Sequence, residues 1–64
     1  MLKFEIKRGY QKRSKKVEQL EKECEKGLTG EVTTEKLDKV IDILTEIEQL
    51  TEKIHKGLKE LKEC

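Results

Sequence analysis

Two lines of apolar residues run through the C-terminal half of this 64-residue sequence at seven-residue intervals. The first line is Leu37, Leu44, Thr51 and Leu58, and the second is Val40, Ile47, Ile54 and Leu61. Four unbroken heptads are typical of a long amphipathic helix that buries one face against other helices, as in a coiled coil. Ile41, Ile43 and Leu50 widen the stripe, which favours two neighbouring helices and therefore a four-helix bundle.

The residues around position 33 carry the signals of a helix start. Thr33 can act as the N-cap residue, and Glu35 falls in the first turn, where the helix dipole favours an acidic side chain. Val32 and Leu37 have the spacing of a hydrophobic staple. We therefore predict a helix over residues 34–63.

The N-terminal half predicts a shorter helix whose start is ambiguous. The residues that share one face at the helical period are Leu2, Ile6, Tyr10, Val17, Leu20 and Cys24. Leu2, Phe4 and Ile6 also alternate with charged residues, which is the spacing of a strand. We expect a helix over residues 10–26, with residues 1–9 as a basic arm or a helical extension. The alternative is an α+β fold with a short strand at residues 2–7.

A turn is predicted at residues 27–33. Gly27 is the expected left-handed residue after the first helix, with Leu28 folding back as the hydrophobic contact of that cap. Two glycines in a short polar connection suit an antiparallel turn. The chain, residues 1–64, is therefore predicted to be a single all-α domain, an antiparallel helical hairpin.

The predicted hairpin has little to bury. Hydrophobic residues make up 33% of the sequence, and its two aromatic residues are Phe4 and Tyr10. Chains this short gain little stability from their core and usually need disulfides, a metal or oligomerisation. We expect a homodimer in which two hairpins pair antiparallel into a four-helix bundle, although a parallel dimer would bury the same heptads.

No motif in the sequence points to catalysis. Ser14 is the only serine and lies among lysines, and the four glycines do not form a phosphate-binding loop. The sequence therefore favours a non-enzymatic oligomeric interaction module (an adaptor, regulator or assembly protein) that needs no cofactor. The residues expected to carry the interaction are Leu37, Val40, Ile41, Leu44, Ile47, Leu50, Ile54, Leu58 and Leu61. Since no segment reads as a signal peptide or a membrane span, we expect a cytoplasmic protein without a membrane partner.

Charge is distributed unevenly along the chain. Residues 1–16 carry seven basic side chains and one acidic side chain, a net +6, whereas the remaining 48 residues carry −5. One interpretation is contact with the phosphates of a nucleic acid. The candidate residues for that contact are Lys7, Arg8, Lys12, Arg13, Lys15 and Lys16. The other interpretation is charge complementarity between the subunits of an antiparallel dimer.

The two cysteines cannot pair within one predicted hairpin. Cys24 lies near the turn and Cys64 at the far end of the second helix, about 45 Å away at 1.5 Å per residue. An antiparallel dimer would bring Cys64 near Cys24 of the partner subunit. We favour two free thiols, which are usual in a cytosol, with an intersubunit disulfide between Cys24 and Cys64 as the alternative.

Glu52 and His55 match the Glu-x-x-His pattern of di-iron helical bundles. Glu52 falls outside the apolar stripe, however, and the first predicted helix offers Val17 and Leu20 rather than a glutamate on its inner face. No metal site is therefore predicted.

Between Val17 and about Ile43 the chain resembles the small subunit of exodeoxyribonuclease VII. The resemblance lies in a helix, a short Gly-acidic-aliphatic turn and a second helix, with Gly30-Glu31-Val32-Thr33-Thr34-Glu35 at the turn. The aromatic-x-x-Gly element of that family is missing, since Asp42-Ile43-Leu44-Thr45 stands in its place. The resemblance implies a second alternative, a non-catalytic helical subunit that binds a large enzyme.

Overall fold

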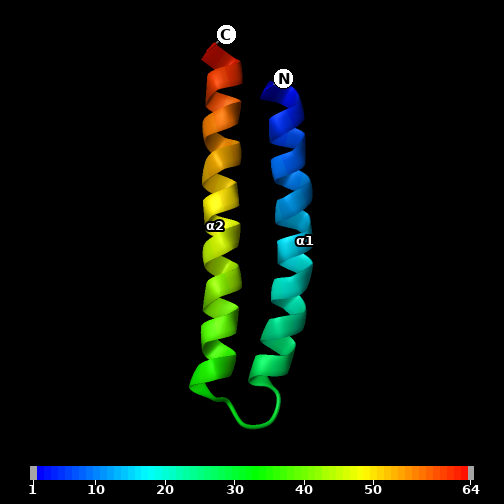
Figure 1. Cartoon of the computed structure of the whole chain (residues 1–64), viewed down its shortest axis with the longest axis vertical. Helices are drawn as coiled ribbons and strands as arrows, with labels where there is room; N and C mark the ends of the chain where they lie inside the picture. The colour runs from blue at the N-terminus through cyan, green and yellow to red at the C-terminus, as the bar shows by residue number, and fades with distance from the viewer. Residues whose placement is uncertain (1, 64) are drawn as a thin grey trace.

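The computed structural model describes residues 2–63, which form two antiparallel α-helices. They are α1 (Leu2–Leu28) and α2 (Thr34–Glu63), joined by residues 29–33. The two helices lie side by side over their whole length, so both ends of the described chain lie together, opposite the connection (Figure 1). The predicted all-α helical hairpin is therefore confirmed.

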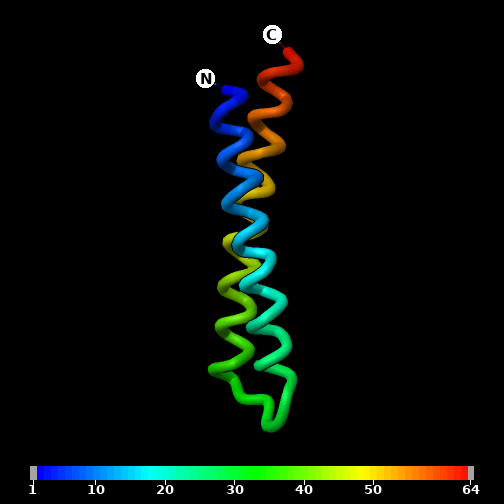
Figure 2. The backbone as a smooth tube through the Cα atoms, turned by 90° about the vertical axis from the view of Figure 1, so that its right-hand side faces the viewer, coloured from blue at the N-terminus to red at the C-terminus, as the bar shows by residue number. Residues whose placement is uncertain are grey.

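The described chain is a rod rather than a compact globule. Its Cα atoms extend over 51 × 15 × 12 Å, and their radius of gyration is 14.9 Å. A compact domain of 64 residues would have a radius of gyration of about 11 Å. The helices cross at a shallow angle and exchange sides between the two ends of the rod, which keeps one side of each helix turned to the other (Figure 2).

The structure decides the ambiguous start of the first helix in favour of the helical extension. The helix α1 starts at Leu2, so the alternative of a strand at residues 2–7 is wrong, and residues 2–9 are a helical extension. Leu2 and Ile6 lie one helical turn apart and are both partly buried. The helical period thus places both side chains against α2, whereas a strand would have left its backbone without a neighbouring strand.

The connection also differs from the prediction. Gly27 and Leu28 remain helical, and Gly30, with φ of 72°, is the residue in the left-handed region. Leu28 is 68% exposed and does not fold back. The hydroxyl of Thr29 donates to the carbonyl of Glu25 at 2.5 Å, which satisfies one of the last carbonyls of α1 without a left-handed residue at position 27.

Thr33 caps the start of α2, as predicted. Its hydroxyl accepts a hydrogen bond from the backbone N–H of Lys36 at 3.3 Å, and its carbonyl accepts one from the N–H of Leu37 at 3.1 Å. The ammonium of Lys36 donates to the carbonyls of Thr29 and Glu31, at 3.4 and 2.8 Å. The connection is therefore tied to the first turn of α2.

The contact between the helices follows a strict heptad spacing on each of them. The residues are 2, 6, 9, 13, 16, 20, 23 and 27 on α1, and 36, 40, 43, 47, 50, 54, 57 and 61 on α2. We call this set the seam. Every seam residue is partly or fully buried, and elsewhere in residues 2–63 the same holds only for Val17, Cys24 and Thr33.

The hydrophobic core along the seam is small. Among residues 2–63, the buried large hydrophobic side chains are Ile43, Ile47 and Ile54, each still 6–7% exposed. In the middle of the seam, Nε of Arg13 donates to the hydroxyl of Thr51 at 2.6 Å, and that hydroxyl donates to the carbonyl of Ile47 at 2.8 Å. The helices are therefore held together by few apolar contacts and by a polar layer at mid-length.

Candidate interaction surface

The seam leaves the hairpin with two broad faces of opposite character. One face is formed by residues that come directly after a seam position: after positions 2, 9, 16 and 23 on α1, and after positions 36, 43, 50 and 57 on α2. Each of these residues is turned about 80° away from the neighbouring helix. Because the helices are antiparallel, these residues of α1 and α2 turn toward the same face of the hairpin. The residues that precede the other seam positions turn toward the opposite face.

The first of these faces is mostly apolar. With Ile41 at its margin, it consists of Lys3, Tyr10, Val17, Cys24, Leu37, Ile41, Leu44, Thr51 and Leu58, and we call it the apolar face. Lys3, at the end of the face near the chain ends, is its one charged member. Leu37, Leu44 and Leu58 are 41–43% exposed, and Tyr10 and Ile41 are 50% and 57% exposed. Proteins that stay monomeric rarely expose so many large apolar side chains along one face, so this face is the candidate interaction surface.

The opposite face is entirely polar. It consists of Glu5, Lys12, Gln19, Lys26, Lys39, Glu46, Lys53 and Glu60, and we call it the polar face. A shallow hollow between the helices brings Glu5 and Lys12 of α1 together with Lys53 and Glu60 of α2. These four residues line one hollow from both helices, as the heptad geometry requires for a shared face.

The nine residues predicted to carry the interaction fall into two groups. Val40, Ile47, Leu50, Ile54 and Leu61 belong to the seam and pack against α1. Leu37, Ile41, Leu44 and Leu58 lie on the apolar face and remain exposed. The first group therefore holds the hairpin together, and the second group is free to contact a partner.

The contribution of α1 to the apolar face was not singled out from the sequence. Val17 and Cys24 are partly buried beside the seam, and Tyr10 continues their line at the same seven-residue spacing. The signal was present, since these residues share one face of the predicted helix, but the antiparallel pairing was needed to place that face beside Leu44 and its neighbours. Phe4 lies apart from them, with the Arg8 guanidinium carbon 5.9 Å from its ring centroid.

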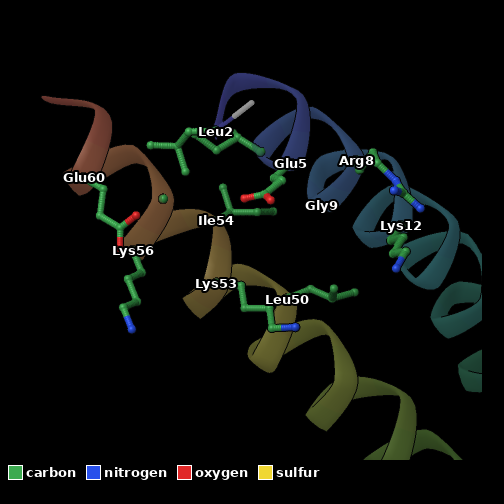
Figure 3. A pocket seen from close by; sticks show the side chains of 12 residues that line it. Leu2, Glu5, Arg8, Gly9, Lys12, Leu50, Lys53, Ile54, Lys56 and Glu60 are labelled. Carbon is green, nitrogen blue, oxygen red and sulfur yellow. The ribbon is translucent and has the colours of Figure 1, made fainter. Parts of the chain in front are cut away.

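The basic residues predicted to contact nucleic acid are split in the same way. Arg13 and Lys16 lie in the seam, where Arg13 bonds to Thr51 and the ammonium of Lys16 pairs with Glu46 at 2.5 Å. Lys7, Arg8, Lys12 and Lys15 are exposed. Figure 3 shows Arg8 and Lys12 of α1 and Lys53 and Lys56 of α2 around the hollow, with Leu50 and Ile54 between the helices. The basic surface thus draws on both helices.

The remaining candidates from the sequence are the two cysteines and the Glu52–His55 pattern. Cys24 is a free, partly buried thiol on the apolar face, while Cys64 lies outside the described residues. Glu52 and His55 are both exposed, and within residues 2–63 no group of three or more His, Cys, Asp or Glu side chains is arranged to hold a metal ion. In the same part of the chain, neither helix has an apolar stretch long enough to cross a membrane.

No protein-family model, curated protein or solved structure matches the chain. These comparisons give no support to the resemblance of residues 17–43 to the small subunit of exodeoxyribonuclease VII.

Proposed function

We propose that this chain is a non-enzymatic, oligomeric interaction module that acts through the apolar face. The observation that carries the proposal is the second line of large apolar residues on α2, which α1 leaves exposed. The seam already covers Ile43, Ile47 and Ile54, whereas Leu37, Leu44 and Leu58 keep 41–43% of their surface exposed for a partner. A four-helix arrangement, in coiled-coil-like contact along this face, would cover them.

The substitution Leu44→Glu tests the proposal, because it places a charge in the middle of the apolar face. If the face is covered in the oligomer, the dissociation constant should rise at least about 100-fold, since an unpaired charge would have to be buried. Sedimentation at low micromolar concentration, with and without reductant, measures the change in mass.

Gln49→Glu is the matched control, because it adds the same charge at an exposed position of α2 outside the apolar face. The control should sediment like the unsubstituted chain. A folded monomer, or a Leu44→Glu chain with the unsubstituted mass, would contradict the proposal. Loss of helix content in Leu44→Glu would agree with it, because a hairpin with so thin a core can depend on its partner for folding.

A second candidate function is the binding of nucleic acid, and one observation favours it. Lys53 and Lys56 of α2 line one hollow together with Arg8 and Lys12 of α1. Lys53 also lines a neighbouring hollow with Lys12 and Lys15, so both helices contribute to the basic surface. Lysine and arginine side chains that neutralise phosphates release counterions, so binding would weaken steeply with salt.

The paired substitutions Lys12→Gln and Lys53→Gln test this candidate. Each phosphate contact that is lost should lower the slope of log affinity against log salt by about 0.9 for duplex DNA. Lys26→Gln with Lys39→Gln is the control, because these lysines lie on the same polar face near the connection. Fluorescence anisotropy with a labelled duplex measures this slope for both pairs of substitutions. An equal decrease in slope for the two pairs would exclude a site at the hollow.

A further inference from the structure

We infer, on the basis of the oligomeric function proposed above, that the partner on the apolar face is a second copy of this chain docked in the antiparallel direction. In this arrangement the connection of one hairpin lies beside the chain ends of the other. Three properties of the described chain support it: its surface area, its distribution of charge and the position of the apolar line of α2.

The surface area indicates one missing partner. The hairpin exposes 5566 Å². A compact folded protein of its mass, 7.5 kDa, exposes about 4,200 Å², so the excess is about 1,300 Å². A stable protein interface removes about 800 Å² from each partner. One copy of the hairpin is long enough to cover the apolar face, because each copy has the same 51 Å length.

The charges of the hairpin separate along its long axis. We divide it at the level of the Lys16–Glu46 pair into a terminal half, residues 2–16 and 48–63, and a loop half, residues 17–47. The terminal half contains eleven basic and five acidic side chains, a net +6, and the loop half contains four basic and nine acidic side chains, a net −5. The sequence did not show this division, because residues 48–63 are neutral overall and join the basic end only through the fold.

This separation of charge favours the antiparallel direction. A parallel pair would place the two +6 halves side by side and the two −5 halves side by side. An antiparallel pair places each +6 half beside a −5 half. Opposed charges of this kind steer association and select one orientation over the other.

The apolar line of α2 is centred at the boundary between the charged halves, so a single two-fold axis there would align both the apolar line and the charges. Two identical chains related by a two-fold axis present the same surface to each other. The line from Leu37 to Leu58 is centred between residues 47 and 48, at the boundary of the charged halves. About that centre, Leu37 lies opposite Leu58 of the partner subunit, and Leu44 opposite Thr51 of the partner subunit.

Thr51 can be covered in this arrangement without leaving its hydroxyl unpaired. The hydroxyl already donates to the carbonyl of Ile47 and accepts from Arg13 within its own chain. A buried hydroxyl is costly mainly when it has no partner, so the one polar residue in this line of α2 does not oppose docking.

Fluorescence energy transfer between labelled subunits tests the orientation. All chains carry Cys64→Ser and Cys24→Ala, which keeps position 24 of the apolar face apolar. One label is attached to either Glu25→Cys or Lys59→Cys, both at exposed positions outside the apolar face. Chains with a donor at position 25 are mixed in denaturant with chains carrying an acceptor at position 25 or at position 59, and are then refolded together. The mass of each refolded mixture is measured by light scattering.

In the antiparallel pair, positions 25 and 59 of different subunits lie at nearly the same level, whereas the two positions 25 lie about 28 Å apart along the axis, at 1.5 Å per residue. Transfer from 25 to 59 should therefore exceed transfer from 25 to 25. The reverse order in a dimer would overturn the antiparallel orientation and leave the proposed function intact. A monomeric mass without transfer would overturn both.

Discussion

At two levels of the seam, an isoleucine side chain packs directly onto the backbone of the facing helix. A Cβ atom added at Gly57 would lie 2.9 Å from Cγ1 of Ile6, and one added at Gly9 would lie 3.0 Å from Cγ1 of Ile54. Real Cβ atoms essentially never show the first distance and seldom show the second, so these glycines permit the close approach of the helices near the chain ends. Each glycine weakens its own helix by about 1 kcal/mol, which the close packing has to offset.

Gly57→Ala should therefore destabilise the hairpin although alanine is the better helix former. Overpacking against Ile6 costs about 1–3 kcal/mol and exceeds the helix-propensity gain of about 1 kcal/mol, so we expect a net loss of about 1 kcal/mol. Urea denaturation followed by circular dichroism, at one protein concentration, measures the change.

Gly27→Ala is the control for this substitution. A Cβ atom at Gly27 would lie 3.6 Å from Cγ2 of Val40, which is ordinary van der Waals contact. The control should gain up to about 1 kcal/mol from helix propensity. If both substitutions raised the free energy of unfolding, the close approach at Gly57 would not matter to stability.

Single residues also show where sequence reasoning falls short. Gly27 was expected to end α1, but the hydroxyl of Thr29 caps the helix and Gly30 takes the left-handed conformation. The role of Gly9 and Gly57 was not predicted, because it depends on an isoleucine in the facing helix. Arg13 interrupts the apolar pattern of α1, yet Thr51 gives it a partner across the seam.

At the level of the helix, α2 serves two surfaces at once. Its stripe is too wide for one neighbour, and the structure divides it into a buried line through Ile47 and Ile54 and an exposed line through Leu44 and Leu58. The sequence predicted the width, the cap at Thr33 and the bounds of α2. It could not divide the stripe, because heptad spacing places both lines on one side of the helix and only the position of α1 distinguishes them.

Ile47→Asp tests the role assigned to the buried line. Ile47 is 6% exposed within the seam, so the substitution removes an apolar contact and buries a carboxylate without a partner. We expect a loss of at least about 3 kcal/mol, which would unfold the hairpin and dissociate the oligomer together. Circular dichroism and sedimentation on the same sample measure both events.

Glu48→Asp controls for the lower helix propensity of aspartate at the next, exposed position. Its circular dichroism and its mass should stay close to those of the unsubstituted chain. An Ile47→Asp chain with an unchanged melting curve would mean that the seam does not stabilise the hairpin.

At the scale of the whole molecule, the hairpin is a charged rod with a basic end and an acidic end. Sequence order conceals this, because the N-terminal and C-terminal segments meet at one end only when the chain folds back on itself (Figure 1). The net charge of the basic end comes from residues 2–16, because residues 48–63 are neutral overall, and the fold keeps the acidic residues 17–47 together at the other end. The orientation of a second copy should respond to this distribution of charge and to salt.

Two triple substitutions distinguish the effect of the charge distribution on association from the effect of net charge. The triple substitution Glu18→Lys, Glu25→Lys and Asp42→Lys changes the loop half from −5 to +1, whereas Glu52→Lys, Glu60→Lys and Glu63→Lys changes the terminal half from +6 to +12. All six positions are exposed and outside the apolar face, and both variants have a net charge of +7.

The antiparallel arrangement predicts opposite results for the two variants in 50 mM salt. The loop-half variant should dimerise at least about 10-fold more weakly, or about 1.4 kcal/mol, because both halves of each copy now repel the other copy. The terminal-half variant should dimerise no more weakly than the unsubstituted chain, because its basic end still faces an acidic end. In 0.5 M salt the difference should shrink, since screening suppresses interactions between exposed charges. Equal weakening of both variants would show that net charge, and not its distribution along the rod, governs the association.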